Sequence, residues 1–306
     1  MTTTAFIFIF ASLLLHSLWH FLCKSSGKAS IAFFAIFSNT LFLTVLSISV
    51  WSGLLFKLPW HVYKFAMLGA FFGVVHEVGL ILAYRNSDIS LAYPVTRALP
   101  VLFTFAITTA SGWGKMLSIW AIAGMLLIFS GCLLMSLSGG EAQDSIRSKI
   151  RAVRKGLLGI VIAAAGTTGY TVADSFGINN IMQFAGDTNR ILTAATYSTY
   201  REITAAFILW SSVMIFGSRI GKKGLCRELI KTPQPYMAGI FAALAYLLVL
   251  VAMNHVSNVS FVQAFQQLSL PVSAALGFVI LKEKISGLRL ISLMMIMAGL
   301  VLCVIK

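Results

Sequence analysis

Five charged side chains interrupt the apolar stretches of this sequence: Glu77, Arg97, Asp174, Arg201 and Glu202. At the centre of a membrane helix a charge costs about 2.5–3.5 kcal/mol on insertion scales, so a charge retained there faces protein or water and usually has a partner. A carboxylate in such a place can carry a proton or attract a cationic group. An arginine can bind a carboxylate or phosphate through two parallel hydrogen bonds.

Two of these residues have a functional and a structural interpretation. We expect Glu77, midway along an apolar run, to face a central cavity; the alternative is a structural ion pair with an arginine of a neighbouring helix. Arg97 lies between Pro94 and Pro100. Each proline removes a backbone donor, so Arg97 could satisfy freed carbonyls, or extend to the membrane interface, instead of binding an anionic ligand. The sequence leaves these alternatives open for both residues.

Other polar and aromatic side chains recur at helical spacing, and residues three or four apart share a helix face. Such sets line a cavity or, as the alternative, form hydrogen bonds between helices. The predicted cavity lining is His16, Trp19, His20, Glu77, Tyr93, Arg97, Tyr170, Asp174, Gln263 and Gln267.

Composition identifies the setting of these residues. Of 306 residues, 58% are hydrophobic and 10% are charged, with a mean hydropathy of +0.91. Soluble proteins carry about a quarter charged residues, so the chain is predicted to be an all-α polytopic membrane protein. A net charge of +14 would suggest nucleic acid in a soluble protein. Here Lys and Arg gather between apolar runs, where they set orientation and meet lipid headgroups, so we expect no nucleic-acid partner.

The cysteines and the first apolar run add two further expectations. The four cysteines form no Cys-x-x-Cys pair, which predicts neither a disulfide framework nor a metal site, and no cofactor is implied. Lys24 is the first charged residue, so we expect residues 4–22 to be a retained helix rather than a cleaved signal peptide.

Ten apolar runs are long enough to span a bilayer, which takes about 20 residues. The longest polar stretches are 139–155 and 218–235, so there is no room between the runs for a soluble domain. The predicted spans are 4–22, 31–55, 62–83, 89–110, 116–138, 156–180, 191–217, 236–255, 259–281 and 286–305.

The two halves of the chain resemble each other. "SDISLA" at 87–92 returns as "SNVSFV" at 257–262, an offset of 170 that places Gln267 at the position of Arg97. This predicts a duplication with one five-helix repeat at 1–138, a polar linker at 139–155 and a second repeat at 156–306. Because five is odd, the halves would insert in opposite senses around a central cavity, as in secondary transporters.

Lys and Arg are distributed unevenly between the two faces. Loops after odd-numbered spans hold 16, whereas the other face, with both termini, holds 5. The positive-inside rule would place the sixteen in the cytoplasm and both termini outside.

Several sequence motifs resemble those of the drug/metabolite transporter superfamily, in particular of its ten-helix EamA branch. The resemblance covers the whole chain. The motifs are "LKEKISGLRLISLMMIMAGLVLCVIK", "YPVTRALPVLF", "GYTVADSFG" and "LLHSLWHFLCKS", the last with Ser17 and His20 where a bacterial subgroup has Ala and Asn. The resemblance implies a multi-pass protein of the bacterial inner membrane. It also implies both termini in the cytoplasm, against the charge count, so the orientation stays open.

These observations favour a secondary transporter, an exporter or exchanger, over an enzyme. The expected substrate is a small polar or amphipathic metabolite such as an amino acid or organic anion, with protons as a candidate coupling ion and a homodimer left open. The alternative is a membrane receptor that binds a small ligand without flux. No nucleophile–base or paired-carboxylate constellation of an intramembrane enzyme is visible, so we expect no catalytic residues.

Overall fold

A computed structural model of the chain describes residues 2–26, 30–86, 89–138, 146–220, 225–272 and 286–305. The side chains of some residues at helix ends, Tyr93 among them, lie outside this description. Apart from short connections, the described part is helical, and it contains no strand.

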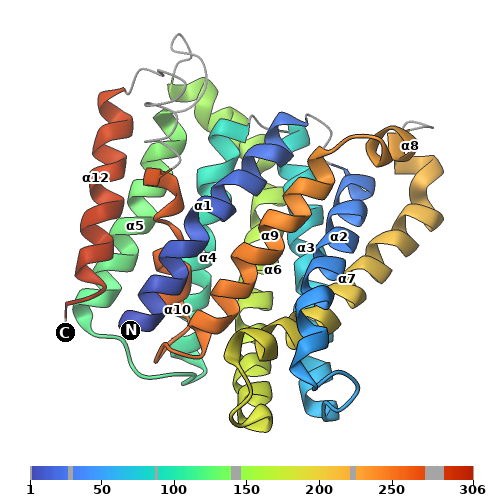
Figure 1. Ribbon diagram of the computed structural model, residues 1–306. Coiled ribbons are helices and arrows are strands. Elements are labelled where there is room, and N and C mark those ends of the chain that lie inside the picture. Colours follow the sequence, from blue (N-terminus) through green and yellow to red (C-terminus); the bar gives the residue numbers. More distant parts are fainter. Residues whose placement is uncertain are drawn as a thin grey trace.

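The described helices follow the predicted apolar runs (Figure 1). They are α1 (Thr3–Ser25), α2 (Ile31–Ser49), the short 3-10 turn η1 (Val50–Ser52), α3 (Trp60–Asn86), α4 (Ile89–Ala110), α5 (Ile119–Ser138), α6 (Ile146–Ala185), α7 (Arg190–Ile220), α8 (Leu225–Ile230), α9 (Gln234–Met253), α10 (Ser260–Gln266) and α12 (Gly287–Leu302).

Six of the described helices are long and apolar enough to cross a membrane, and two shorter apolar helices cover 94–110 and 287–302. The spanning segments are Thr3–Cys23, Ile31–Ser52, Trp60–Ala83, Ile119–Leu137, Arg154–Ala185 and Gln234–Met253. This is the architecture of a membrane protein.

Two of the predicted spans differ clearly from the structure, and α8 lies in a stretch that was predicted to be polar and was given no helix. The helix predicted at 156–180 begins at Ile146 and ends at Ala185, so its first turns occupy part of the predicted linker 139–155. Lys, Arg and Ala, which dominate 147–155, are strong helix formers whatever their polarity. The predicted span 259–281 begins with α10, and its residues from 273 onward lie outside the described part.

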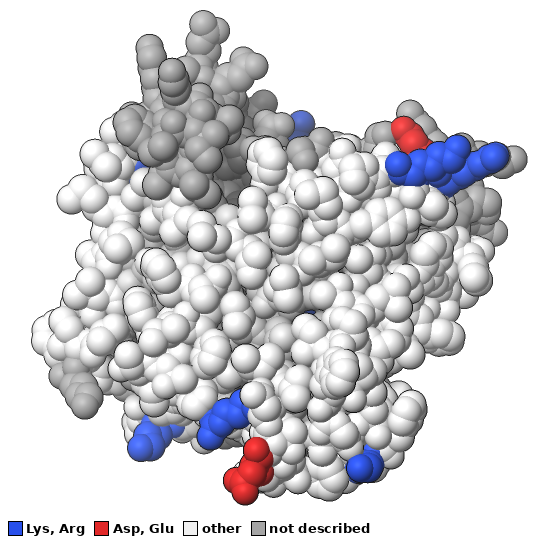
Figure 2. Space-filling model, in the orientation of Figure 1, with Lys and Arg blue, Asp and Glu red and all other residues white. Residues whose placement is uncertain are grey.

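The surface has the banding of a bilayer-embedded protein. Figure 2 shows Lys, Arg, Asp and Glu gathered at the two ends of the visible face, with a broad uncharged band between them. The end that carries both termini (Figure 1) also carries exposed tryptophans. Trp51, Trp60 and Trp120 are 80%, 70% and 50% exposed. Tryptophan is typical of the membrane–water interface, so this end marks one boundary of the bilayer.

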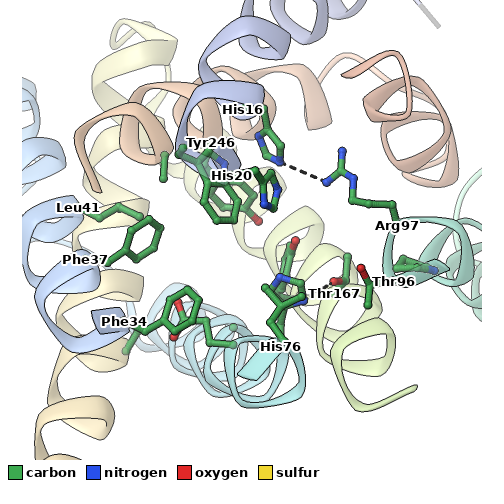
Figure 3. Close-up of a pocket in the computed structure, with 18 of the residues that line it drawn as sticks. His16, His20, Phe34, Phe37, Leu41, His76, Thr96, Arg97, Thr167 and Tyr246 are labelled. Atoms are coloured by element: carbon green, nitrogen blue, oxygen red, sulfur yellow. Dashed lines mark hydrogen bonds between the residues drawn. The ribbon is translucent and has the colours of Figure 1, made fainter. Parts of the chain in front are cut away.

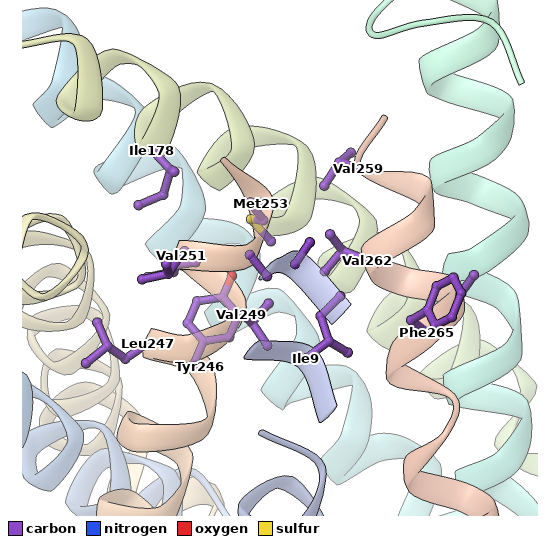
Figure 4. Packing of buried hydrophobic residues seen from close by; sticks show 14 of the residues in the cluster. Ile9, Ile178, Tyr246, Leu247, Val249, Val251, Met253, Val259, Val262 and Phe265 are labelled. Atoms are coloured by element: carbon purple, nitrogen blue, oxygen red, sulfur yellow. The ribbon is translucent and has the colours of Figure 1, made fainter. Parts of the chain in front are cut away.

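Helices far apart in the sequence pack side by side. α3 lies along α6, α1 along α9, α2 along α7 and α5 along α12. Figure 4 shows α1, α9 and α10 meeting through Ile9, Val249, Met253 and Val262, all of them buried.

Glycines permit the closest of these contacts. A Cβ on Gly124 would meet the backbone of Gly299 and a Cβ on Gly299 the backbone of Gly124, so α5 and α12 touch through their main chains. Gly166 of α6 likewise packs on the backbone of His76 in α3. Small residues at such positions let membrane helices approach each other closely.

Proline explains why α10 is short. The ring of Pro271 lacks an N–H and clashes with the carbonyl four residues earlier, which belongs to Gln267. The regular helix accordingly ends at Gln266, and Leu270 N donates to Gln267 O over three residues, at 3.0 Å. The helix is therefore interrupted at Gln267, the residue that the 170-residue offset matches with Arg97.

Candidate functional site

A cavity of about 90 Å³ lies between the helices, and α1, α2, α3, α4, α6, α7, α9 and α10 all contribute to its wall (Figure 3). Arg97, Tyr170 and Arg201 each lie two or more helical turns from the ends of their helices, so the cavity is deep within the bundle. Its polar and ionisable lining is His16, Trp19, His20, His76, Glu77, Thr96, Arg97, Thr167, Tyr170, Arg201, Glu202, Tyr246, Gln263 and Gln267.

Arg97 reaches from α4 across the cavity to both halves of the chain. Its Nη2 donates to the carbonyl oxygen of Gln266 at 3.0 Å and to Ser269 Oγ at 3.1 Å, and its Nη1 lies 3.3 Å from His16 Nε2 (Figure 3). The guanidinium does satisfy a free carbonyl, but one freed by the break in α10 rather than by the prolines of α4. Its Nε is buried without a partner in the described part of the chain. Arg97 therefore has only neutral described partners.

An imidazole cluster adjoins the arginine. His16 contacts Trp19, and the Trp19 ring stacks on His20 with centroids 3.5 Å apart. From α3, His76 Nδ1 lies 2.8 Å from Thr167 Oγ1 and 3.0 Å from the carbonyl oxygen of Ala163. The stripe predicted on α1 thus faces the cavity and is matched by a third histidine from α3.

Gln263 of α10 and Gln267, which directly follows α10, also lie in this wall. Gln263 donates its amide to Thr171 Oγ1 of α6, and Gln267 donates to the carbonyl oxygen of Gln263 at 3.0 Å. Gln267 Oε1 is buried without a partner among the described residues. An acceptor in this position can receive a hydrogen bond from a ligand.

A charged network connects α6 and α7 beside the cavity. Arg201 donates from Nε to Asp174 Oδ2 at 2.9 Å and from Nη1 to Glu202 Oε1. Tyr197 and Tyr246 donate their hydroxyls to the two oxygens of Asp174, at 2.7 and 2.6 Å. Because Asp174 is fully buried and has three donors, it needs no water, and its charge is compensated inside the protein.

Local sequence makes room for this network. A Cβ on Gly69 of α3 would collide with the Asp174 carboxylate, and one on Gly73 would lie 3.1 Å from Arg201 Nη2. The Arg201 guanidinium also lies over the rings of Tyr170 and Tyr246, with its Cζ 5.3 and 4.8 Å from their centroids. Aromatic faces stabilise a desolvated cation, so Arg201 is held from several sides.

Glu77 is the one carboxylate of the cavity wall that remains outside this network. It forms no ion pair with any described residue, and its Oε2 is buried without a hydrogen-bond partner there. The structural alternative considered for Glu77, an ion pair with a neighbouring arginine, is thus absent from the described part of the protein.

Eight of the ten predicted site residues line this cavity; the other two are Asp174 and Tyr93. Asp174 is fully buried and does not itself line the cavity, but it binds Arg201 and Tyr246, which do. Because α6 extends to Ala185, Asp174 lies well inside the helix and not near its end. The side chain of Tyr93 lies outside the described part of the protein.

Sequence reasoning missed four polar lining residues: His76, Thr96, Thr167 and Tyr246. It named Arg201 and Glu202 as charges within apolar runs but did not include them in the predicted cavity lining. His76 precedes Glu77 directly, so an ionisable pair within an apolar run was a signal that could have identified it. Thr96, Thr167 and Tyr246 carry no charge and resemble ordinary residues of a membrane helix, so the sequence held no comparable signal for them.

No family model matches the sequence, and no curated protein matches it. In fold, the chain is similar to a protein of known crystal structure, with a TM-score of 0.71 over 99% of this chain and 98% of that chain. The two sequences are 16% identical, so the likeness concerns the fold alone. It extends over both chains from end to end.

Proposed function

We propose that the protein is a secondary transporter, an exporter or exchanger, for a small polar or amphipathic metabolite such as an amino acid or organic anion. It works by alternating access between two inverted five-helix repeats that together provide ten membrane spans. The proposal includes two further points that rest on the resemblance of its motifs. The protein belongs to the EamA branch of the drug/metabolite transporters, and it is located in the bacterial inner membrane.

One observation carries the proposal: a buried polar cavity at which the two halves of the chain meet. Arg97 of the first half donates to the backbone and side chain of the second half at the broken helix α10. Interrupted helices whose free backbone groups face a central site are typical of secondary transporters. A purely structural bundle has no need of a polar cavity, since burying polar groups is costly in hydrocarbon.

The pattern of helix packing supports two equivalent halves. If α1, α2, α3, α4 and α5 are matched in order with α6, α7, α9, α10 and α12, the contact of α3 with α6 becomes that of α9 with α1. The α2–α7 and α5–α12 pairs each map onto themselves. In an inverted repeat, each helix of one half packs in the same surroundings as its counterpart in the other half. Exchanging the two halves must therefore reproduce the same helix contacts, as it does here.

The cavity favours a small ligand with an anionic group. Its volume of about 90 Å³ is below the range of roughly 300–1,000 Å³ typical of drug-sized ligands. Arg97 Nε has no partner among the described residues, and the other donors of this guanidinium bind only neutral groups, so an anionic ligand group such as a carboxylate suits Arg97.

A paired metabolite profile tests this function. Cells that produce the wild type, Arg97→Gln or Arg97→Lys at matched levels are compared by the metabolites inside them and in their medium. One class of compound should cross the membrane with the wild type only. Arg97→Lys should transport poorly, because lysine lacks the planar fork of donors.

Other outcomes would change the assignment. Equal flux with all three proteins would leave transport standing and make Arg97 structural. No shift of any compound, together with binding of a small ligand to the purified protein, would favour the receptor alternative.

A further inference from the structure

We propose that Glu77 is the cation site of the cavity, where a proton and the positively charged group of the substrate compete for one carboxylate. The inference rests on the proposed transport function and specifies it. The substrate is a zwitterion that carries an anionic and a cationic group, and the protein exchanges it for a proton.

The position of Glu77 on α3 places it next to the charged network. Gly69, Gly73 and Glu77 are spaced four residues apart and share one face of the helix. Gly69 packs against Asp174 and Gly73 against Arg201, so this face of α3 looks onto the network. Glu77 occupies the next turn along it, and there it lines the cavity.

No described cation forms an ion pair with Glu77. Arg201 already holds two carboxylates, those of Asp174 and Glu202. The described charges around this end of the cavity therefore comprise three carboxylates and one guanidinium. An ionised carboxylate without a partner costs several kcal/mol in a low-dielectric interior, so Glu77 takes up a cation or a proton.

The other groups that face Glu77 do not provide that cation. From α7, Arg201 and Glu202 act on it with opposite charges, while α2 presents only apolar side chains to the cavity. From α1, His20 lines the same cavity and Cys23 lies within the field of Glu77. From α6, Tyr170 lines the cavity, and Asp174 is fully engaged by its three donors.

Arg97 provides the complementary pole. The Arg97 guanidinium has only neutral described partners, and the Glu77 carboxylate in the same cavity has no described partner. A ligand with a carboxylate for Arg97 and an ammonium group for Glu77 satisfies both at once. Binding of the ammonium group releases the proton held by Glu77, and departure of the ligand allows one proton to return, so charge and protons balance over a cycle.

Difference infrared spectroscopy on the full-length protein in lipid tests the site. A protonated carboxylic acid absorbs apart from carboxylates and amides, so it can be counted. The empty wild type at neutral pH should show the band of one protonated carboxyl group. The matched control Glu228→Gln, which alters a carboxylate of α8 outside the cavity, should keep the band, and Glu77→Gln should lose it.

Two probes then test the zwitterion. Saturating leucine should remove the band from the wild type, whereas 4-methylpentanoate, which has the same carbon skeleton without the amine, should leave it. A band that survives in Glu77→Gln or is absent from the wild type overturns the proton site. A band that leucine leaves unchanged overturns the competition.

The outcomes separate this inference from the proposed function. If the wild type moves a solute in the metabolite profile but shows no Glu77 band, the inference fails and transport stands. If the band is present and no solute moves, the transport function fails while the protonated carboxyl group remains.

Discussion

Replacement of Asp174 by asparagine should destabilise the protein by about 3 kcal/mol. Removing one partner of a buried ion pair typically costs about 3–5 kcal/mol, because the remaining charge is left uncompensated. The lower figure applies here because Arg201 keeps Glu202 as a second partner. Asparagine can turn its carbonyl oxygen toward Arg201 Nε and its amide toward Tyr197, whose hydroxyl can rotate to accept, so the cost comes from the lost negative charge rather than from an unsatisfied donor.

Thermal unfolding of the purified protein in detergent or nanodiscs measures this effect. At roughly 2–4 °C per kcal/mol for chains of this order of size, the unfolding midpoint should fall by about 6–12 °C. A double-mutant cycle sharpens the test. Asp174→Asn with Arg201→Met should be less destabilised than the sum of the single variants, because the double variant removes both ends of one pair.

A midpoint for Asp174→Asn within about 1 °C of the wild type would refute the reasoning, given the 2–4 °C expected for each kcal/mol. It would mean that the buried carboxylate is not charged or that the pair is compensated by groups not considered. Strictly additive effects in the cycle would show that Asp174 and Arg201 do not act as a pair.

Three further predictions concern positions around the site. Gly69→Ala should lower the thermal midpoint by several degrees, because its Cβ meets the Asp174 carboxylate, whereas Gly287→Ala, at the start of α12 with open space around it, should not; equal effects would contradict the close contact. Tyr197→Phe removes one hydrogen bond to a charged group and should cost about 1.5–3 kcal/mol in urea or thermal unfolding, and a neutral effect would exclude that bond. Burial, followed by the charge of Arg190, lowers the pKa of His255 below its usual 6.5, so the unfolded chain binds more protons below that pH. Stability should therefore fall on acidification below about pH 6.5, and less steeply in His255→Gln; identical pH profiles for the two proteins would argue against it.

Much of the helical framework follows from the apolar runs alone. α4, for example, coincides with the predicted span 89–110 in spite of two internal prolines, because hydrophobic length decides a membrane helix more strongly than propensity does. The extension of α6 to Ile146 and the short helix α8 were not predicted, because polar residues at a membrane surface can be helical or not with little difference in free energy.

The site was only partly predictable for a different reason. Comparison of the two halves made Gln267 the position equivalent to Arg97, and in the structure Arg97 donates to the carbonyl oxygen of the neighbouring Gln266. The pairing of Asp174 with Arg201 depends on how α6 and α7 are rotated about their axes, which no local pattern encodes. The burial of His76 against α6 depends on the close α3–α6 contact for the same reason.

The central claim is that the cavity opens alternately to the two sides of the membrane, and cysteine labelling tests it most directly. Ala205 of α7 lines the cavity and is 4% exposed, while Phe207, two residues on, is 74% exposed on the apolar surface. Both are replaced by cysteine in a variant whose four native cysteines are serine. A membrane-impermeant thiol reagent is then applied to right-side-out and to inverted vesicles.

We expect Ala205→Cys to react from either side, and Phe207→Cys to react from neither because it faces lipid. Reaction of Ala205→Cys from one side only, whatever solutes are present, would contradict alternating access and favour a receptor with a single entrance.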